Sequence, residues 1–338
     1  MMFRMKLLEK GVPRSRKVCI LAAFIFAAHV LATVSSGQIL TKETSSAQAS
    51  KITFQTKFDP ATPLESRVNR PPEEIQQDLQ KLPAPSPKLH TLSEMERSEI
   101  SAVLGKLPDF SRKAIMLHVR SITFVDDFGA NGTTGAENPA VPTTFDMALR
   151  ASLLHENISE FLTRKERNYY SDDPGIRLSI AAGSMPALLY VLLHESVHVL
   201  DISNRGGKPG FPQLFPGENS DRFVRGIWEN TTTMTTTYQS PLFKMSWFGT
   251  RKQQNPELAV DTYRTLAKTP FVSLYGSSNW HDDIAELVTC YYFTQILKQP
   301  YRIVVQKNNA VIYSLEPMKN PLVQARFREV VPLYAKQS

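Results

Sequence analysis

Residues 192–199 read Leu-Leu-His-Glu-Ser-Val-His-Val, which places an H-E-x-x-H pattern inside an apolar run. If this run is an α-helix, His194 and His198 lie one turn apart on the same face, so both imidazoles can bind one tetrahedral metal ion. Glu195 then lies beside the metal and is the natural general base, because an adjacent carboxylate can take a proton from a water that the metal has made acidic. The pattern predicts a zinc site.

The residues around the pattern favour a helix. Residues 186–193 form an apolar approach with Ser184 as a candidate N-cap, and Gly206 and Gly207 provide a stop. With 7 histidines in 338 residues, chance produces the pattern in about one chain in a hundred. The alternative is a helix whose two histidines belong only to the core, but two imidazoles and a carboxylate on an apolar helix need polar partners. The absence of stoichiometric zinc would favour that alternative.

Residues 1–37 have the pattern of an export signal. Basic residues dominate the first 17 positions, residues 18–34 are an unbroken apolar run, and Ser35, Ser36 and Gly37 are small. The run is slightly short for a transmembrane helix, so cleavage is favoured over a retained membrane anchor. We therefore expect an exported protein, periplasmic or secreted, that contacts a membrane only through this segment if it is not cleaved.

Charge and cysteine content narrow the function further. Removing the six basic residues and one acidic residue of residues 1–37 lowers the formal net charge from +7 to +2. No basic stripe with interleaved aromatic residues remains, so we expect no nucleic-acid partner. Cys19 lies in the export segment and leaves Cys290 alone, which excludes an internal disulfide framework. Cys290 is then expected to be a small buried hydrophobic residue.

Composition divides the rest of the chain into two parts. Residues 38–90 are rich in Ser, Thr, Pro, Lys and Gln and predict a flexible tether. Residues 91–338 predict one large domain, because the chain is long and 42% hydrophobic. Periodicity and caps predict helices over 94–104 (with a capping box of Ser93 and Glu96), 111–118, 158–169 and 258–267, a long helix from Asn279 to Phe293, and a closing helix over 321–335 that Pro332 interrupts. Strands are predicted over 121–125, 147–153 and 175–181, with a hairpin of 301–306 and 311–315.

Two long segments predict irregular structure. Residues 129–144 are rich in Gly, Asn, Thr and Pro and predict a loop. Residues 202–256 predict a long insertion, which forms either one wall of a substrate cleft or an ordinary surface excursion. Trp228 and Trp247 of this insertion are equally compatible with a place in the core.

Two histidines leave at least one protein ligand to find. The metzincins place Gly and His seven and ten residues after the first histidine, whereas this chain has Asp201 and Asn204. The segment from Tyr275 to Glu286 instead resembles the gluzincins, the group that includes thermolysin and anthrax lethal factor. It follows the lethal-factor pattern of Tyr, three residues, Asn, two residues, Glu, three residues, Glu, and the resemblance covers residues 184–204 and 271–295.

The resemblance implies roles for the acids and the tyrosine of this segment. Tyr275 would donate a hydrogen bond in the transition state, Asp282 would be the third metal ligand, and Glu286 would accept the ring N–H of a ligating histidine. The sequence departs from the family pattern at Asp282, where the family has the longer Glu. Glu286 is therefore the alternative ligand, with His281 and Asp283 as weaker ones.

The resemblance also implies a fold and an activity. We expect an α+β, zincin-like, two-lobed metallopeptidase domain with an active-site helix and a small mixed sheet. It would be an exported Zn²⁺-dependent enzyme that hydrolyses peptide bonds of a protein or peptide substrate. The alternative is an exported zinc-binding interaction or scaffold protein that has lost turnover, which Asp282 favours and Glu195 opposes, because a structural zinc site has no use for a base.

Overall fold

The computed structural model of the chain describes residues 58–81, 87–206, 208, 210, 212–215, 221–243 and 253–335. The predicted export segment, Cys19, residues 38–57 of the predicted tether, Gly207 and Trp247 lie outside these residues. None of the helices in the described ranges is both long enough and apolar enough to cross a membrane.

The described chain is α+β, as predicted, and its first sheet has four strands. The strands lie in the order β1 (Lys88–Leu89), β2 (Val119–Asp126), β4 (Phe145–Arg150), β3 (Gly132–Ala136). The sheet is mixed, because β2 and β4 run parallel while β1 and β3 are antiparallel to their neighbours. Strand β3 lies at an edge of this sheet.

The second sheet is antiparallel and has three strands. Its order is β5 (Ile176–Ala181), β6 (Arg302–Lys307), β7 (Ala310–Leu315). The turn between β6 and β7 contains Asn308 and Asn309, which have φ of 50° and 66°. Asparagine tolerates this left-handed conformation, and two such residues in succession are typical of a tight hairpin turn. The predicted hairpin is thus confirmed.

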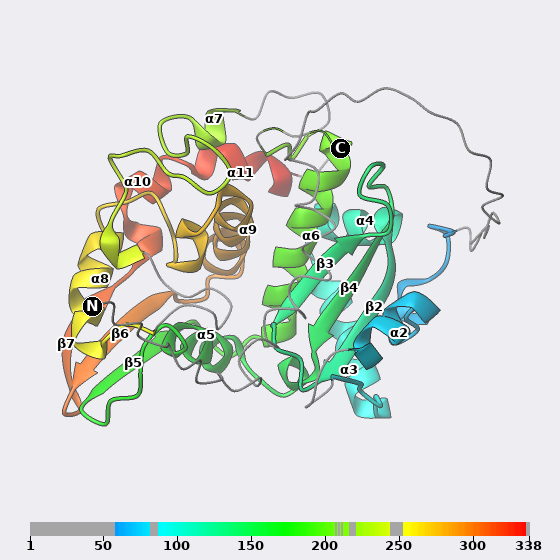
Figure 1. Ribbon diagram of the computed structural model, residues 1–338, viewed down its shortest axis with the longest axis horizontal. Helices are drawn as coiled ribbons and strands as arrows, with labels where there is room; N and C mark the ends of the chain where they lie inside the picture. Colours follow the sequence, from blue (N-terminus) through cyan, green and yellow to red (C-terminus); the bar gives the residue numbers. More distant parts are fainter. Residues whose placement is uncertain are drawn as a thin grey trace, which may run out of the picture.

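Helix α6 (Ala187–Arg205) lies between the first sheet and helix α9 (Trp280–Tyr291) (Figure 1). Its first ten residues are buried, since the apolar run before the H-E-x-x-H pattern is covered on every side. The helix ends at Gly206, whose φ of 59° is the left-handed conformation that glycine adopts most readily. The prediction of Ser184 as N-cap is wrong: Pro186 takes that position, and the Glu156 carbonyl accepts the N–H of Ala187 at 3.0 Å in place of a capping side chain.

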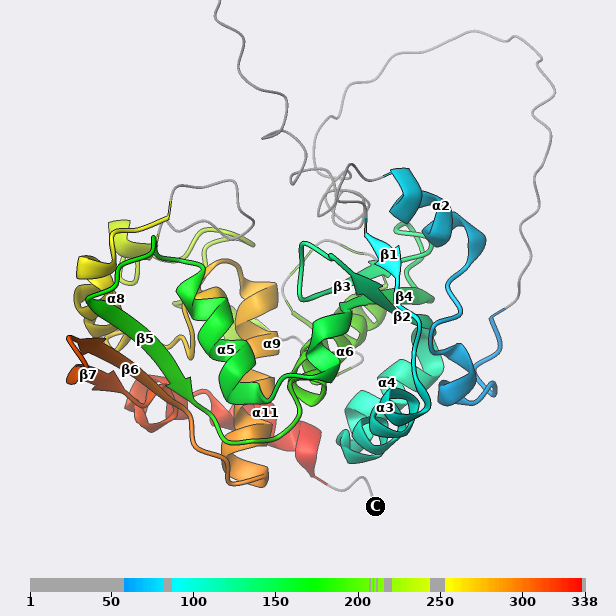
Figure 2. The same cartoon turned by 90° about the horizontal axis from the view of Figure 1, so that it is seen from below.

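The remaining helices form two groups on either side of α6 and α9 (Figure 2). One group accompanies the first sheet, and the other accompanies the second sheet. The capping boxes at Ser93 and Asn157 show why the two helices that follow these residues begin where they do. The first group is α2 (Glu73–Lys81), α3 (Glu94–Lys106) and α4 (Asp109–His118); the second is α5 (Ile158–Arg167), α8 (Ala259–Leu266) and α10 (Pro321–Gln324), while α11 (Phe327–Tyr334) packs against α9 and α4.

Four predictions about local structure need correction. The predicted loop over 129–144 contains β3, which sequence periodicity does not reveal because its residues are Gly-Thr-Thr-Gly-Ala. The strand predicted over 147–153 begins earlier, and its last residues form a 3₁₀ turn, Ala151–Leu154. The helix predicted from Asn279 to Phe293 changes to π geometry over Tyr292–Ile296. The closing helix breaks between α10 and α11, while Pro332 is tolerated inside α11.

Part of the segment predicted as a tether carries defined structure. It contains a 3₁₀ turn (Leu64–Arg67), α2 and β1. The buried guanidinium of Arg67 donates to the carbonyls of Thr62, Met116 and Val119 at 2.8 to 2.9 Å. These bonds attach the segment to the start of β2, an arrangement that a composition-based prediction does not detect.

The described parts of the predicted insertion over 202–256 are largely irregular, as predicted. Apart from the end of α6 and the start of a 3₁₀ turn (Pro256–Leu258), they contain only the short helix α7 (Asp221–Val224), a 3₁₀ turn (Pro241–Phe243) and two isolated bridges, Trp228 to Met234 and Tyr170 to Gln254. Trp228 is buried in the core.

Candidate metal centre

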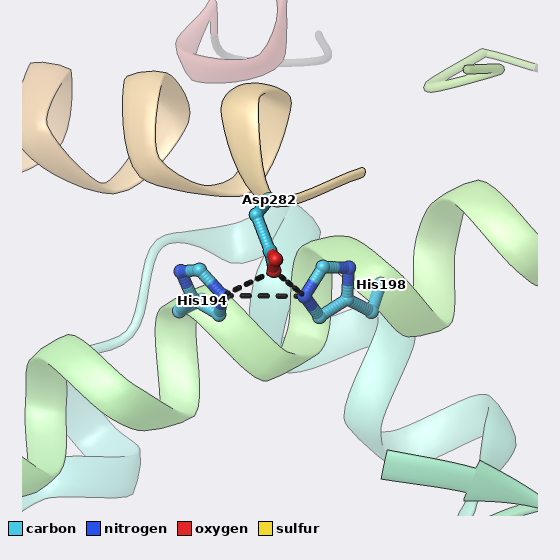
Figure 3. Close-up of side chains that lie close together, drawn as sticks. All are labelled: His194, His198 and Asp282. Carbon is cyan, nitrogen blue, oxygen red and sulfur yellow. Dashed lines mark hydrogen bonds and ion pairs between the residues drawn. The ribbon is translucent and has the colours of Figure 1, made fainter. Parts of the chain in front are cut away.

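His194 and His198 lie one turn apart on α6 and face the same side of the helix (Figure 3). Their Nε2 atoms are 3.2 Å apart, and their rings are nearly perpendicular, at 81°. His194 is buried and His198 is partly buried. Two ring nitrogens this close together form the first two corners of a candidate metal site.

Asp282 completes this group from the first turn of α9 (Figure 3). Asn279, the N-cap of the helix, accepts the Asp282 N–H at 2.9 Å and donates from Nδ2 to the Asp282 Oδ2 atom at 2.7 Å. Ser278 donates to the same Oδ2 atom at 3.1 Å. The other oxygen, Oδ1, lies 3.7 Å from Nε2 of His194 and 3.5 Å from Nε2 of His198. The capping interaction therefore orients one carboxylate oxygen toward both histidines.

His194, His198 and Asp282 form a group that could hold a metal ion, with ligand atoms all within 4.8 Å of one another. Burial alone would lower the pKa of His194, but the carboxylates of Asp282 and Glu286 outweigh it and raise this pKa to about 9. Interactions with His194 and His198 hold the pKa of Asp282 well below its ordinary value, although burial acts in the opposite direction. The site therefore favours a positive charge between these three side chains, as a metal cation would supply.

Glu286 lies one turn after Asp282 and contacts the other nitrogen of His194. Its Oε1 atom is 3.2 Å from Nδ1 of His194, off the line of a hydrogen bond, so this buried Nδ1 has no hydrogen-bond partner in the present arrangement. The carboxylate accepts hydrogen bonds from Lys165 at 3.1 Å and Tyr190 at 3.0 Å on Oε1, and from Ser273 at 2.6 Å on Oε2. Burial would raise the pKa of Glu286, but Lys165 and His194 outweigh it and lower this pKa to about 2.

The position of Glu286 bears on the choice between the two acids. Its oxygen atoms accept hydrogen bonds from three donors, and Oε1 is also in ion-pair contact with Nδ1 of His194, whereas Oδ1 of Asp282 faces both Nε2 atoms. The geometry therefore favours Asp282 as the ligand and Glu286 as the group that orients His194.

Glu195 lies next to His194 on α6 and is 7% exposed. Its Oε2 atom accepts a hydrogen bond of 2.7 Å from Oγ1 of Thr134 in β3. The edge strand of the first sheet therefore fixes one oxygen of this carboxylate.

Tyr275 lies in a 3₁₀ turn, Tyr275–Ser277, before α9. Its ring centroid is 5.8 Å from that of His194, and the ammonium of Lys165 lies 3.9 Å from its ring centroid. Burial and the nearby carboxylates of Asp282, Glu195 and Glu286 raise the pKa of its hydroxyl well above the ordinary value. Tyr275 therefore stays a hydrogen-bond donor at neutral pH.

The weaker alternatives for the third ligand lie outside this group. His281 faces Asp201, with Nδ1 3.2 Å from Oδ2. Asp283 is fully buried and accepts two hydrogen bonds from Arg326, at 2.9 and 2.7 Å, and one from the indole of Trp228 at 2.8 Å. Both side chains are used to attach α9 to neighbouring segments.

Cys290 is also outside the group. It is 2% exposed, and its sulfur lies 3.7 Å from the Tyr190 hydroxyl. The prediction that this residue is buried is confirmed.

Four residues of this region were not predicted from the sequence: Thr134, Lys165, Tyr190 and Ser273. Thr134 and Lys165 belong to β3 and α5, which lie far from the H-E-x-x-H pattern in the sequence. Tyr190 precedes His194 by one helical turn, a spacing that could have indicated a shared face.

No protein-family model, no curated protein and no solved structure matches this chain. The resemblance to the gluzincins therefore rests on the residues of the two segments named above and stays a prediction.

Proposed function

We propose that this chain is a zinc-dependent peptidase. The observation that carries the proposal is the triangle formed by the two Nε2 atoms and Oδ1 of Asp282, with sides of 3.2, 3.5 and 3.7 Å. Bonds of about 2.0–2.2 Å to a tetrahedral zinc place ligand atoms about 3.3–3.6 Å apart. The donor set of two imidazoles and one carboxylate fits zinc, and three protein ligands leave a fourth position for water or substrate, as in catalytic sites.

The proposed function also implies a fold. We infer a zincin-like domain of two lobes, in which α6 is the active-site helix and the mixed sheet belongs to the first lobe. The proposal gains support from β3, an edge strand of this sheet that reaches Glu195 through Thr134. An extended peptide can add to such an edge by main-chain hydrogen bonds, which favours a protein or peptide substrate.

In the proposed mechanism, each side chain of the centre has a separate role. When bound, Zn²⁺ would polarise the scissile carbonyl and acidify a water molecule. Glu195 accepts a proton from the attacking water and delivers it to the leaving nitrogen, so that a C–O bond forms as the C–N bond breaks. Tyr275 donates a hydrogen bond to the carbonyl oxygen as negative charge develops there. Glu286 holds His194 in the orientation that presents Nε2 to the centre.

The alternative function, an exported zinc-binding scaffold without turnover, accounts for fewer of these features. A purely structural zinc site normally has four protein ligands and needs neither a base nor a buried hydrogen-bond donor beside it. Here Glu195 and Tyr275 both lie next to the ligands. We also propose that the protein is exported and that it has no nucleic-acid partner.

The test is turnover of peptides by the zinc-loaded protein and by Glu195→Gln. The wild type should cleave members of a mixed peptide library, with new termini identified by mass spectrometry. The Gln variant should keep zinc and lose about 10²- to 10⁴-fold in rate, the usual cost of removing a general base. Cleavage by Glu195→Gln at the wild-type rate would overturn the peptidase proposal.

A further inference from the structure

The edge strand β3 encloses the carboxylate of Glu195 from one side. Alternate residues of a strand point to the same face, so Gly132 and Thr134 share the face that meets α6. Thr134 donates from Oγ1 to Oε2 of Glu195 at 2.7 Å. The hydrogen bond joins two residues that are 61 positions apart in the sequence. It uses only one of the two carboxylate oxygens.

Gly132 leaves the space that the other oxygen needs. A Cβ atom at this position would lie 2.8 Å from Oε1 of Glu195 and 2.8 Å from Cγ1 of Val191, with Leu149 at 3.1 Å. Contacts this short require the carboxylate or the neighbouring apolar side chains to move. The glycine therefore allows β3 to approach the carboxylate closely, at the point where Thr134 binds it.

We propose that Thr134 is a positioning residue for the general base and that Gly132 is required for the same geometry. Thr134 holds Oε2, so that Oε1 is the oxygen that accepts the proton from water. A free glutamate can rotate about its side-chain bonds, and fixing one oxygen removes that freedom before the reaction. This inference rests on the proposed peptidase function, but the orientation of Glu195 can also be tested without turnover.

The chain offers a matched control in the adjacent residue. Thr133 lies on the other face of β3, and its buried Oγ1 has no hydrogen-bond partner in the described structure. Thr133→Val and Thr134→Val make the same chemical change one position apart, and only the second removes the hydrogen bond to Glu195. Thr134→Ser restores the hydroxyl.

The experiment measures kcat, KM and zinc content for the full-length zinc-loaded protein, for these three variants and for Gly132→Ala. Thr134→Val should lose about tenfold to a hundredfold in kcat, the usual cost of misplacing a reacting group. Its KM and zinc content should stay within a factor of about two. Thr134→Ser should recover most of the rate, Thr133→Val should match the wild type, and Gly132→Ala should be at least as slow as Thr134→Val.

A binding measurement gives the second readout. Acetohydroxamate chelates zinc and shares a proton with a neighbouring carboxylate. Its Kd therefore reports the position of Glu195 without any need for substrate turnover. Thr134→Val should raise this Kd about tenfold, the cost of about one lost hydrogen bond, while Thr133→Val leaves it unchanged. Wild-type kcat and Kd in Thr134→Val would overturn the inference and leave the peptidase proposal intact. A shifted Kd together with full activity of Glu195→Gln would overturn the peptidase proposal instead.

Discussion

Glu286 contacts Nδ1 of His194 at 3.2 Å, whereas Asp282, one helical turn earlier, faces Nε2 of the same ring at 3.7 Å. The two acidic side chains of α9 therefore lie next to opposite nitrogens of one imidazole ring. In the proposed centre, Asp282 would therefore bind the metal on the Nε2 side and Glu286 would orient the ring from the Nδ1 side.

The first prediction follows from this division. Glu286→Gln should weaken zinc binding by about 10- to 100-fold, the usual effect of losing a carboxylate that orients a ligating histidine. Asp282→Asn should weaken it more, because one of three protein ligands loses its charge. Competition with a zinc chelator of known affinity measures both changes. A larger loss in the Glu286 variant would make this a His-His-Glu site.

The second prediction concerns Tyr275. Tyr275→Phe removes the hydroxyl and keeps the ring that packs near His194. We expect kcat to fall by about 10²- to 10³-fold, as for the loss of one oxyanion donor, with zinc content unchanged. Steady-state kinetics and metal analysis of the same sample check this. An unchanged kcat would remove Tyr275 from the mechanism.

The third prediction concerns the cation that accompanies Glu286. Lys165 and Glu286 are 11% and 1% exposed, so Lys165→Met leaves a buried carboxylate without its cation. Breaking such a pair costs about 3–5 kcal/mol in the free energy of unfolding. Lys307, whose partner Glu257 is 3.0 Å away and whose pair is about half exposed, provides the control, and Lys307→Met should cost less than about 1 kcal/mol. Urea unfolding measures both, and equal losses would contradict the assignment of Lys165.

The fourth prediction concerns pH. Burial raises the pKa of Glu166 to about 7, although the Tyr263 hydroxyl donates to it at 2.7 Å. Because the folded-state pKa lies above the ordinary value of 4.5, the protonated acid stabilises the fold below about pH 4.5. That contribution is lost as the pH rises through about 7. Glu166→Gln cannot ionise and should gain up to about 3 kcal/mol in unfolding free energy over the wild type between these pH values.

Urea unfolding of both proteins across pH 4 to 8 tests this fourth prediction. The comparison is a difference between two proteins under identical conditions, so the pH dependence of metal binding affects both alike. A constant difference across this pH range would show that the pKa of Glu166 is the same in the folded and unfolded states, which would contradict this prediction.

Local signals in the sequence predicted the elements that carry the candidate centre. The apolar run and Gly206 indicated α6, and Asn279 indicated the start of α9. These predictions succeed because caps and helical periodicity depend on residues close together in the sequence. The choice between Asp282 and Glu286 depends on how α9 crosses α6, which spacing along one helix does not determine.

The supporting residues depend on tertiary packing. Strand β3 carries two glycines and two threonines in five residues, so it has no apolar alternation that would predict a strand. Pairing with β4 produces it, and that pairing brings Thr134 to Glu195. In the sequence, Lys165 looks like any other lysine of a charged helix. Its role depends on its contact with Glu286 of α9, which only the tertiary structure shows.

Metal analysis of the purified protein tests whether His194, His198 and Asp282 bind zinc, as proposed. The protein should be purified without chelators, dialysed, and compared with His198→Ala by mass spectrometry of the metal content. We expect one zinc per chain in the wild type and less than about a tenth of that in His198→Ala, because two remaining ligands do not hold zinc through dialysis. Wild-type protein without stoichiometric zinc, or a His198→Ala variant that retains it, would rule out the proposed zinc site.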